Sequence, residues 1–99
     1  MTFRMNALGA AALALSLSAG STAALAQAEF YKDKTVNIYV GYSSGGGYDV
    51  YARMISRFMG KHIPGNPTVI VTNMPGAGSL RAANYVYNLA PKDGTAMGT

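Results

Sequence analysis

Two glycine clusters, at residues 43–47 and 75–78, constrain this chain of 99 residues most, because each separates two runs of different periodicity. Before the first cluster, residues 35–42 are β-branched and aromatic, with apolar residues at alternate positions, which predicts a strand with one buried face. After it, residues 50–59 repeat apolar side chains every three or four positions, which predicts an amphipathic helix.

The same alternation continues along the chain. Residues 68–73 predict a second strand, and its continuous apolar centre favours cover on both faces. Ser79 stands where it would cap a second helix over residues 80–90, which Pro91 ends. Residues 95–99 begin a third strand. The order β-α-β-α-β with short connections predicts an α/β fold in which parallel strands are joined by right-handed crossover helices.

Composition excludes several classes of protein. The chain has no cysteine, so disulfide scaffolds and thiolate-bound zinc or iron–sulfur sites are excluded, and no cofactor is expected. With 49% hydrophobic and 12% charged residues it is not a disordered chain. Its eight Lys and Arg are scattered, so no nucleic acid partner is expected. Residues 45–50 lack the third glycine of a dinucleotide-binding fingerprint, and no P-loop is present.

The first residues are typical of a cleavable secretory signal peptide. Arg4 precedes a stretch, residues 7–26, that has no charge and consists mainly of Ala, Leu, Gly, Ser and Thr. Cleavage after Ala26 or Ala28 fits the small-x-small pattern, and we favour Ala28, so residues 1–28 are the predicted signal peptide. The expected location is the periplasm. Without a cysteine there is no lipid anchor, and the apolar end at residues 96–99 predicts a truncated chain.

Both glycine clusters follow a strand and precede a helix, which places them at the same edge of a parallel sheet. Open α/β sheets bind ligands at that edge, and helix N-termini with glycine-rich loops present N–H groups to anions. Two such loops would hold a carboxylate or a phosphate. The alternative is that both clusters are simply tight turns.

The remaining polar residues do not assemble a catalytic site. Asp49 either caps the first helix or fixes the loop toward a ligand, and the two roles are compatible. His62 is interpreted as a cap at a helix C-terminus. Arg53, Arg57, Lys61 and Arg81 are interpreted as solvated. No nucleophile, base and oxyanion site are visible together, so no catalytic residue is predicted and the chain is not expected to be an enzyme.

Two motifs at this separation, Gly-Gly-x-x-Asp at residues 45–49 and Asn-x-Pro-Gly-Ala-Gly at residues 73–78, resemble those of the Bug receptors. These are periplasmic substrate-binding proteins of tripartite tricarboxylate transporters. The resemblance implies a type II periplasmic binding fold, with residues 29–99 as the N-terminal portion of the first domain and the remainder of a two-domain protein missing. It also implies a small carboxylate solute, delivery to membrane permease subunits, and a monomer when full length.

In that family the two loops hold the solute carboxylate through backbone N–H groups and ordered water. The resemblance therefore assigns substrate binding here to Ser44, Gly45, Gly46, Gly47, Asp49, Gly76, Ala77 and Gly78. Gly98 and Thr99 would start a further contributor.

The sequence departs from the family pattern in two places. Residues 41–44 read Gly-Tyr-Ser-Ser where many members have Pro followed by an aromatic residue, and residues 79–82 read Ser-Leu-Arg-Ala in place of Gly-Asn-x-Gly. Leu80 or Arg81 would change the shape or charge beside the site, so the sequence does not name the solute. Two alternatives remain: an exported α/β enzyme or regulator that binds an anionic metabolite, and a non-functional truncated remnant.

Overall fold

The computed structural model describes residues 22, 23 and 25–99. Most of the predicted signal peptide, residues 1–28, lies outside the described residues. Its described part is helical, and that helix continues to residue 31. Within the described part of the chain, no helix combines the length and the apolar character needed to cross a membrane.

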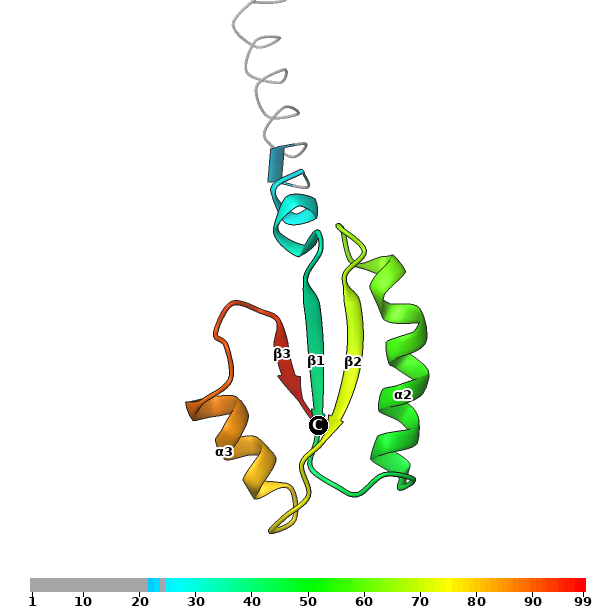
Figure 1. The fold of residues 1–99 in the computed structure, drawn as a ribbon, viewed down its shortest axis with the longest axis vertical. Coiled ribbons are helices and arrows are strands. Elements are labelled where there is room, and N and C mark those ends of the chain that lie inside the picture. The colour runs from blue at the N-terminus through cyan, green and yellow to red at the C-terminus, as the bar shows by residue number, and fades with distance from the viewer. Residues whose placement is uncertain (1–21, 24) are drawn as a thin grey trace, which may run out of the picture.

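Three strands and two longer helices alternate along the rest of the chain (Figure 1). In chain order they are β1 (Thr35–Val40), α2 (Gly47–Met59), the short 3₁₀ helix η1 (Gly60–His62), β2 (Thr68–Asn73), α3 (Leu80–Asn88) and β3 (Ala96–Gly98). The predicted order of elements is confirmed.

The three strands form one parallel sheet in the order β2-β1-β3. In the central strand, Ile38 pairs with Val71 on one side and with Met97 on the other. All three strands therefore end at the same edge, at the bottom of Figure 1, whereas the helix that precedes β1 lies at the opposite end. The prediction of an α/β fold with parallel strands is confirmed.

The two helices cover opposite faces of the sheet. Ile38 and Val40 of β1 pack with Ala52 of α2 on one face. On the other face the ring of Tyr39 lies 5.0 Å from that of Tyr85 on α3. Since β2 and β3 flank β1 on opposite sides, two crossovers of the same hand must pass over opposite faces, and this is the arrangement observed.

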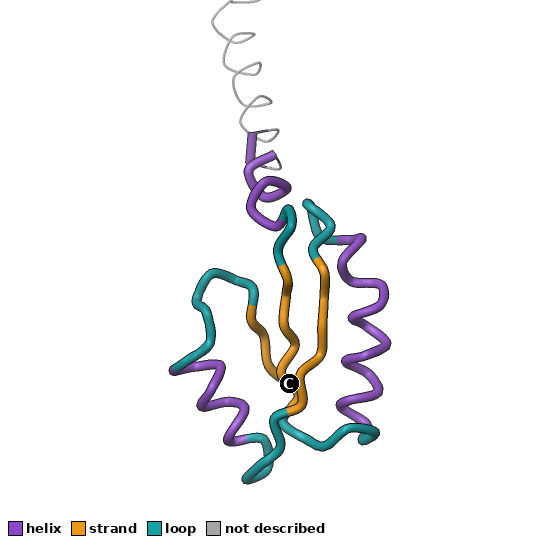
Figure 2. Tube along the Cα trace, in the orientation of Figure 1, coloured by secondary structure: helices purple, strands orange, loops and turns teal. Residues whose placement is uncertain are grey.

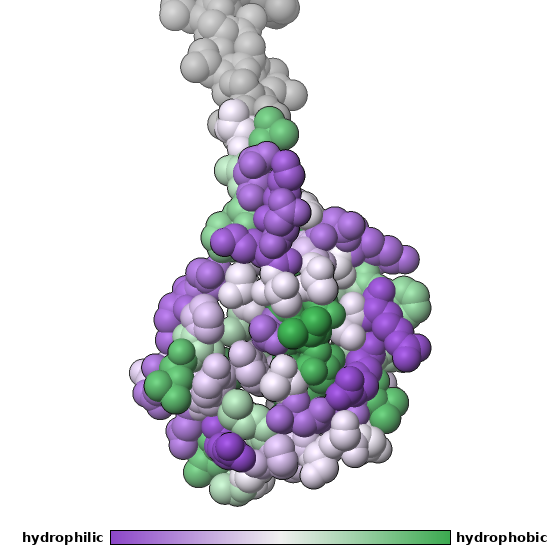
Figure 3. Space-filling model, viewed as in Figure 1, coloured by the Kyte–Doolittle hydropathy of each residue, from purple (hydrophilic) through white to green (hydrophobic). Residues whose placement is uncertain are grey.

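The strand β2 is less covered than its sequence predicts. Ile70 is 42% exposed, because β2 lies at the edge of the described sheet and α3 packs on β1 and β3. The expectation that β2 is covered on both faces is therefore wrong for the described residues. Figure 3 shows a cluster of strongly hydrophobic residues near the middle of this face of the molecule.

Candidate functional site

Two loops meet at the carboxyl edge of the sheet. Loop 1, residues 41–46, joins β1 to α2, and loop 2, residues 74–79, joins β2 to α3 (Figure 2). Their first residues are held together, since the Met74 N–H donates a 2.7 Å hydrogen bond to the Val40 carbonyl oxygen. The prediction that both glycine clusters lie at one edge is confirmed. Thr99 also reaches this edge, where its carbonyl oxygen accepts from the Gly41 N–H at 3.1 Å.

The buried carboxylate of Asp49 connects loop 1, α2 and the end of β2. Asp49 is 2% exposed. Its Oδ2 accepts from the Gly45 N–H at 2.9 Å, its Oδ1 accepts from Asn73 Nδ2 at 2.8 Å, and both oxygens lie 3.0 Å from Arg53 Nε. The Gly45 N–H, and after it Arg53 and Asn73, lower the pKa of Asp49 to about 2. The carboxylate is therefore ionised and its acceptors face protein donors.

Asn73 extends this network across the loops. Its Nδ2 also donates to the Tyr42 carbonyl oxygen at 3.0 Å, and its Oδ1 accepts from Arg53 Nη2 at 2.9 Å. Ser44 Oγ lies 3.4 Å from both Asn73 Oδ1 and Arg53 Nη2. The end of β2 is thereby fixed to the start of loop 1 by side chains.

Sequence reasoning missed the part played by Arg53 and Asn73. The sequence pattern predicts a solvated Arg53. Although its side chain is 47% exposed, it pairs with Asp49 in the one ion pair found among the described residues. The Asp49–Arg53 spacing of four residues, which places both side chains on one helix face, was the available signal. Asn73 stood in the second motif without an assigned role.

Asp49 acts on the start of α2 from inside the helix. The residue at the N-cap position is Gly46, which has no side chain to cap with, and Asp49 is the third helical residue. From there it reaches back past Gly46 to the N–H of Gly45, one residue beyond the N–H that a capping box would bind. Asp49 therefore fixes loop 1, but it forms no cap bond to an N–H group of α2, so the predicted capping role is wrong.

An aromatic pair closes the base of loop 1. The rings of Tyr42, at the start of the loop, and Tyr48, in the first turn of α2, stack with centroids 5.0 Å apart and planes 12° apart. Stacking of this kind stabilises a loop by about 0.5–1.5 kcal/mol beyond the area it buries. It holds the ends of the segment that carries the Ser44–Gly47 amides.

Loop 2 has an unusual backbone. Gly76, Ala77, Gly78 and Ser79 have φ angles of 145°, 49°, 59° and 75°, so four successive residues lie in or near the left-handed region. Residues with a Cβ atom disfavour this region. The two glycines adopt it without backbone strain, whereas Ala77 and Ser79 do not.

The prediction that Ser79 caps α3 through its side chain is wrong. Ser79 does occupy the N-cap position, but its left-handed backbone replaces the extended conformation of a capping serine, and no side-chain cap bond forms. Its hydroxyl instead donates to the Thr99 carbonyl oxygen at 3.5 Å. Ser79 packs against Gly41, where a Cβ atom would lie 1.9 Å from Ser79 Oγ, so loop 2 lies directly over the end of β1.

Several backbone N–H groups of the two loops have no acceptor among the described residues. Among the residues predicted to bind substrate, these include the amides of Ser44 and Gly47 in and after loop 1, and those of Gly76, Ala77 and Gly78 in loop 2. The Gly45 amide is bound to Asp49, and that of Gly46 is 3.5 Å from the Ser43 carbonyl oxygen. The eight residues predicted to bind substrate lie at this edge, but the N–H groups of Gly45 and Gly46 and the carboxylate of Asp49 are engaged by the protein.

The charge at this edge is positive. Arg53 and Arg81 flank the loops, and the Asp49 carboxylate is paired with Arg53. The other three acidic residues of the chain, Glu29, Asp33 and Asp93, precede β1 or β3 and lie toward the amino end of the sheet. An anion at the two loops would therefore meet free donors and a net positive charge.

Comparison with known proteins gives one informative match. The chain is 35% identical over 83 residues to a protein of Cupriavidus necator described as "UPF0065 protein in gbd 5'region". The match includes 84% of this chain and 25% of the relative, so the chain spans about a quarter of the length of the curated protein it matches. No family model matches the chain, and no solved structure matches it significantly. The chain is a homologue of a UPF0065 protein.

Proposed function

We propose that this chain is part of an extracytoplasmic solute receptor of the Bug type, the family to which the UPF0065 designation corresponds. In this role it binds a small carboxylate solute and serves a tripartite tricarboxylate-type transporter, without catalysis. The solute's carboxylate lies between loop 1 and loop 2 and accepts hydrogen bonds from their backbone N–H groups. The homology over 84% of the chain supports the family assignment.

One observation carries the assignment of the site. Two loops at the ends of adjacent parallel strands both present N–H groups that have no acceptor among the described residues. Hydrogen bonds from such donors to a carboxylate each contribute about 1.5–3 kcal/mol, because the acceptor is charged. The positive end of each helix dipole, at the N-termini of α2 and α3, adds to the attraction.

The eight predicted residues divide into two roles in this proposal. Ser44, Gly47, Gly76, Ala77 and Gly78 supply amides to the solute. Asp49 is a positioning residue, because its oxygens accept hydrogen bonds from Gly45, Arg53 and Asn73. These bonds hold the shape of loop 1. Gly45 gives loop 1 the backbone conformation that this shape requires, with a φ of 90°, and Gly46 is the N-cap residue of α2.

The proposal is tested by NMR titration of the full chain labelled with ¹⁵N. Succinate is added at constant ionic strength, with chloride as the control anion. We expect the amide resonances of both loops to shift together with a single Kd of about a millimolar, which corresponds to roughly 4 kcal/mol of binding free energy. The amide resonances of η1, at the other end of the sheet, serve as the internal control.

A pair of substitutions at Gly47 tests the role of its amide. Proline fits here, because Gly47 is the first residue of α2, Gly46 before it has φ −75° and ψ 172°, and a Cβ atom at Gly47 has nothing within 4 Å. Gly47→Pro removes the N–H and is expected to weaken succinate binding by about tenfold or more. Gly47→Ala retains the N–H and is the matched control, with binding within about twofold of the original.

The outcomes separate clearly. Loop resonances that stay unchanged with succinate, or that move equally with chloride, would contradict the proposed function. Equal succinate binding by Gly47→Pro and Gly47→Ala would show that the Gly47 amide does not bind the solute. The amides of loop 2 would then be tested in the same way.

We infer further that the chain is exported to the periplasm and that its signal peptide is cleaved after Ala28. Expression in a bacterial host, followed by fractionation and N-terminal sequencing, checks this. A periplasmic product that begins at Glu29 is the expected result, and one that begins at Gln27 would move the cleavage site to Ala26. Retention of Met1 on a cytoplasmic product would contradict the inference.

A further inference from the structure

Arg81 places an unpaired cation beside loop 2. It is the second residue of α3, and its stem lies against the loop, since a Cβ atom built on Gly76 would be 3.2 Å from Arg81 Cδ. Arg81 Nη1 donates to the Pro75 carbonyl oxygen at 3.3 Å. No acidic side chain pairs with Arg81 in the part of the chain that the structure describes. The guanidinium is therefore held at one nitrogen while its other N–H groups are free to bind.

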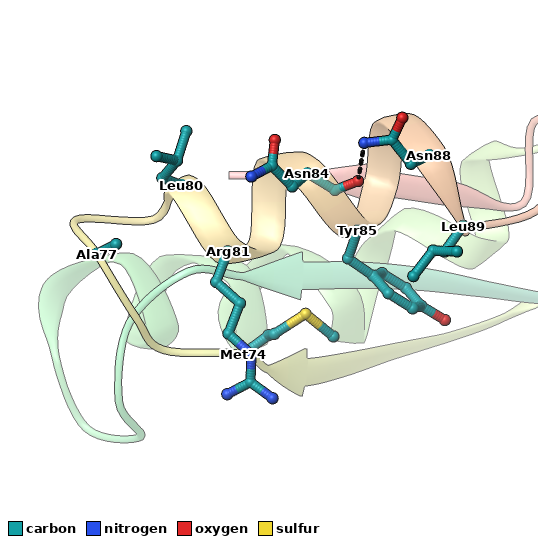
Figure 4. Close-up of a pocket in the computed structure, with 8 residues that line it drawn as sticks. All are labelled: Met74, Ala77, Leu80, Arg81, Asn84, Tyr85, Asn88 and Leu89. Atoms are coloured by element: carbon teal, nitrogen blue, oxygen red, sulfur yellow. Dashed lines mark hydrogen bonds between the residues drawn. The ribbon is translucent and has the colours of Figure 1, made fainter.

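A cavity of about 740 Å³ adjoins this guanidinium. Figure 4 shows the side chains of Arg81, Tyr85 and Leu89 extending from α3 on the side toward Met74, while Ala77 lies in the loop at the left. Ala77 belongs both to the wall of this cavity and to loop 2, so the cavity begins where the candidate carboxylate site ends.

The lining of the cavity favours a ligand with an acidic group. It contains one positive charge, Arg81, and no carboxylate. The other lining side chains are apolar or aromatic apart from the neutral amides of Asn84 and Asn88, and the Asn88 amide donates to the Asn84 carbonyl oxygen at 3.0 Å. Guanidinium groups bind carboxylates through two parallel N–H groups, and a free fork of this kind is what Arg81 offers.

We propose that Arg81 is a specificity-determining residue that binds a second carboxylate of the solute, so that the preferred ligands are dicarboxylates. This inference rests on the proposed function, which assigns the first carboxylate to the two loops. In this proposal the two carboxylates of a four-carbon dicarboxylate are bound separately, one by the loop amides and the other by Arg81. Leu80, which stands beside Arg81 where the sequence departs from the family pattern, also lines the cavity.

The test compares succinate with butyrate, which has the same number of carbons and one carboxylate. Both are titrated into the full ¹⁵N-labelled chain and into Arg81→Gln, which keeps most of the stem and loses the charge. We expect succinate to bind the original chain about tenfold more tightly than butyrate. In Arg81→Gln this preference disappears because only succinate binding weakens, and Arg81→Lys retains part of it.

Two controls accompany this comparison. Arg57→Gln removes the same charge from α2, away from the cavity, and is expected to leave the preference unchanged. The side-chain Nε–H resonance of Arg81 in the original chain is expected to shift with succinate and not with butyrate. This second measurement needs no variant, so it decides the matter even if Arg81→Gln does not fold.

Each outcome bears on one of the two proposals. Equal binding of succinate and butyrate by the original chain, an equal loss of both in Arg81→Gln, or the same loss in Arg57→Gln would overturn the role of Arg81 and leave the loops as a carboxylate site. A failure of both acids to shift the loop amides would overturn the proposed function and the role of Arg81 together.

Discussion

The side-chain amide of Asn73, the last residue of β2, donates a 2.8 Å hydrogen bond to the buried carboxylate of Asp49 on α2. The carbonyl oxygen of the same amide accepts from Arg53, so the orientation of the amide is set by a negative charge on one side and a positive charge on the other. A side chain that is both donor and acceptor is needed at this position. The two loops depend on it for their relative placement.

Substitution of Asn73 by leucine tests this dependence. Asn73→Leu has similar size but removes the donors to Asp49 and to the Tyr42 carbonyl oxygen, and is expected to lower the free energy of unfolding by about 1–3 kcal/mol. Urea unfolding followed by circular dichroism measures the change. Asn88→Leu is the control, since Asn88 is an exposed residue of α3 and leucine is a good helix former. Equal losses in both variants would contradict the role of Asn73.

The stability of the chain is expected to fall between about pH 4 and pH 2. The pKa of Asp49 is lowered from 3.8 to about 2 by the Gly45 N–H, Arg53 and Asn73. As the pH falls through this range, the unfolded chain takes up a proton before the folded chain does, so protons favour unfolding. Above about pH 5 the contribution is complete and the stability no longer changes for this reason.

Two variants show which carboxylate causes this loss of stability in acid. Hydrogen bonds from Thr95 also lower the pKa of Asp93, so both carboxylates contribute in acid. Unfolding curves of Asp49→Asn and Asp93→Asn, measured from pH 2 to pH 7, separate the two. We expect the larger loss of acid dependence in Asp49→Asn. An unchanged slope in that variant would show that Asp49 keeps an ordinary pKa in the folded chain.

Gly41, just after the end of β1, is constrained by close packing against Ser79. A Cβ atom on Gly41 would lie 1.9 Å from Ser79 Oγ and 2.7 Å from Ser79 Cα, so Gly41→Ala must displace loop 2 from the end of β1. Overpacking of this kind costs about 1–3 kcal/mol. Gly47→Ala is the control, because nothing lies within 4 Å of the added atom, and it is expected to change the stability by less than about 1 kcal/mol. Similar thermal unfolding of the two variants would rule out the packing argument.

The fold was predictable from the sequence because its signals are local. Periodicity alone placed a strand before the first glycine cluster and a helix after it, and the observed helix, Gly47–Met59, starts only a few residues before the first apolar repeat. Parallel pairing then followed from the alternation of strands and helices. These two steps also placed both loops at one edge, which is the central feature of the candidate site.

The features that were not predictable depend on contacts between distant parts of the chain. The link between Asp49 and Asn73 joins residues 24 positions apart, and nothing in the sequence near either residue indicates the other. The exposure of Ile70 depends on which strands α3 covers, which is a property of the whole sheet. Ser79 has a left-handed backbone and lies against Gly41, 38 residues away in the chain, whereas the local pattern favoured an ordinary capping serine.

Replacement of Ser79 by glycine is expected to stabilise the chain. Ser79 has a φ of 75°, and for a residue with a side chain the left-handed conformation costs about 1–2 kcal/mol. Glycine removes this cost and loses one weak hydrogen bond, to the Thr99 carbonyl oxygen at 3.5 Å, together with some entropy of the unfolded chain. The expected net gain is about 0.5–1 kcal/mol in urea unfolding.

Ser43→Gly in loop 1 is the matched control for this prediction, because Ser43 does not have a positive φ and its replacement brings only the entropic loss. In the Ser79→Gly background, Gly41→Ala is expected to cost less than in the original chain, since two of the three atoms nearest its Cβ are gone. A loss of stability in Ser79→Gly equal to that in Ser43→Gly would show that the left-handed backbone of Ser79 carries no strain.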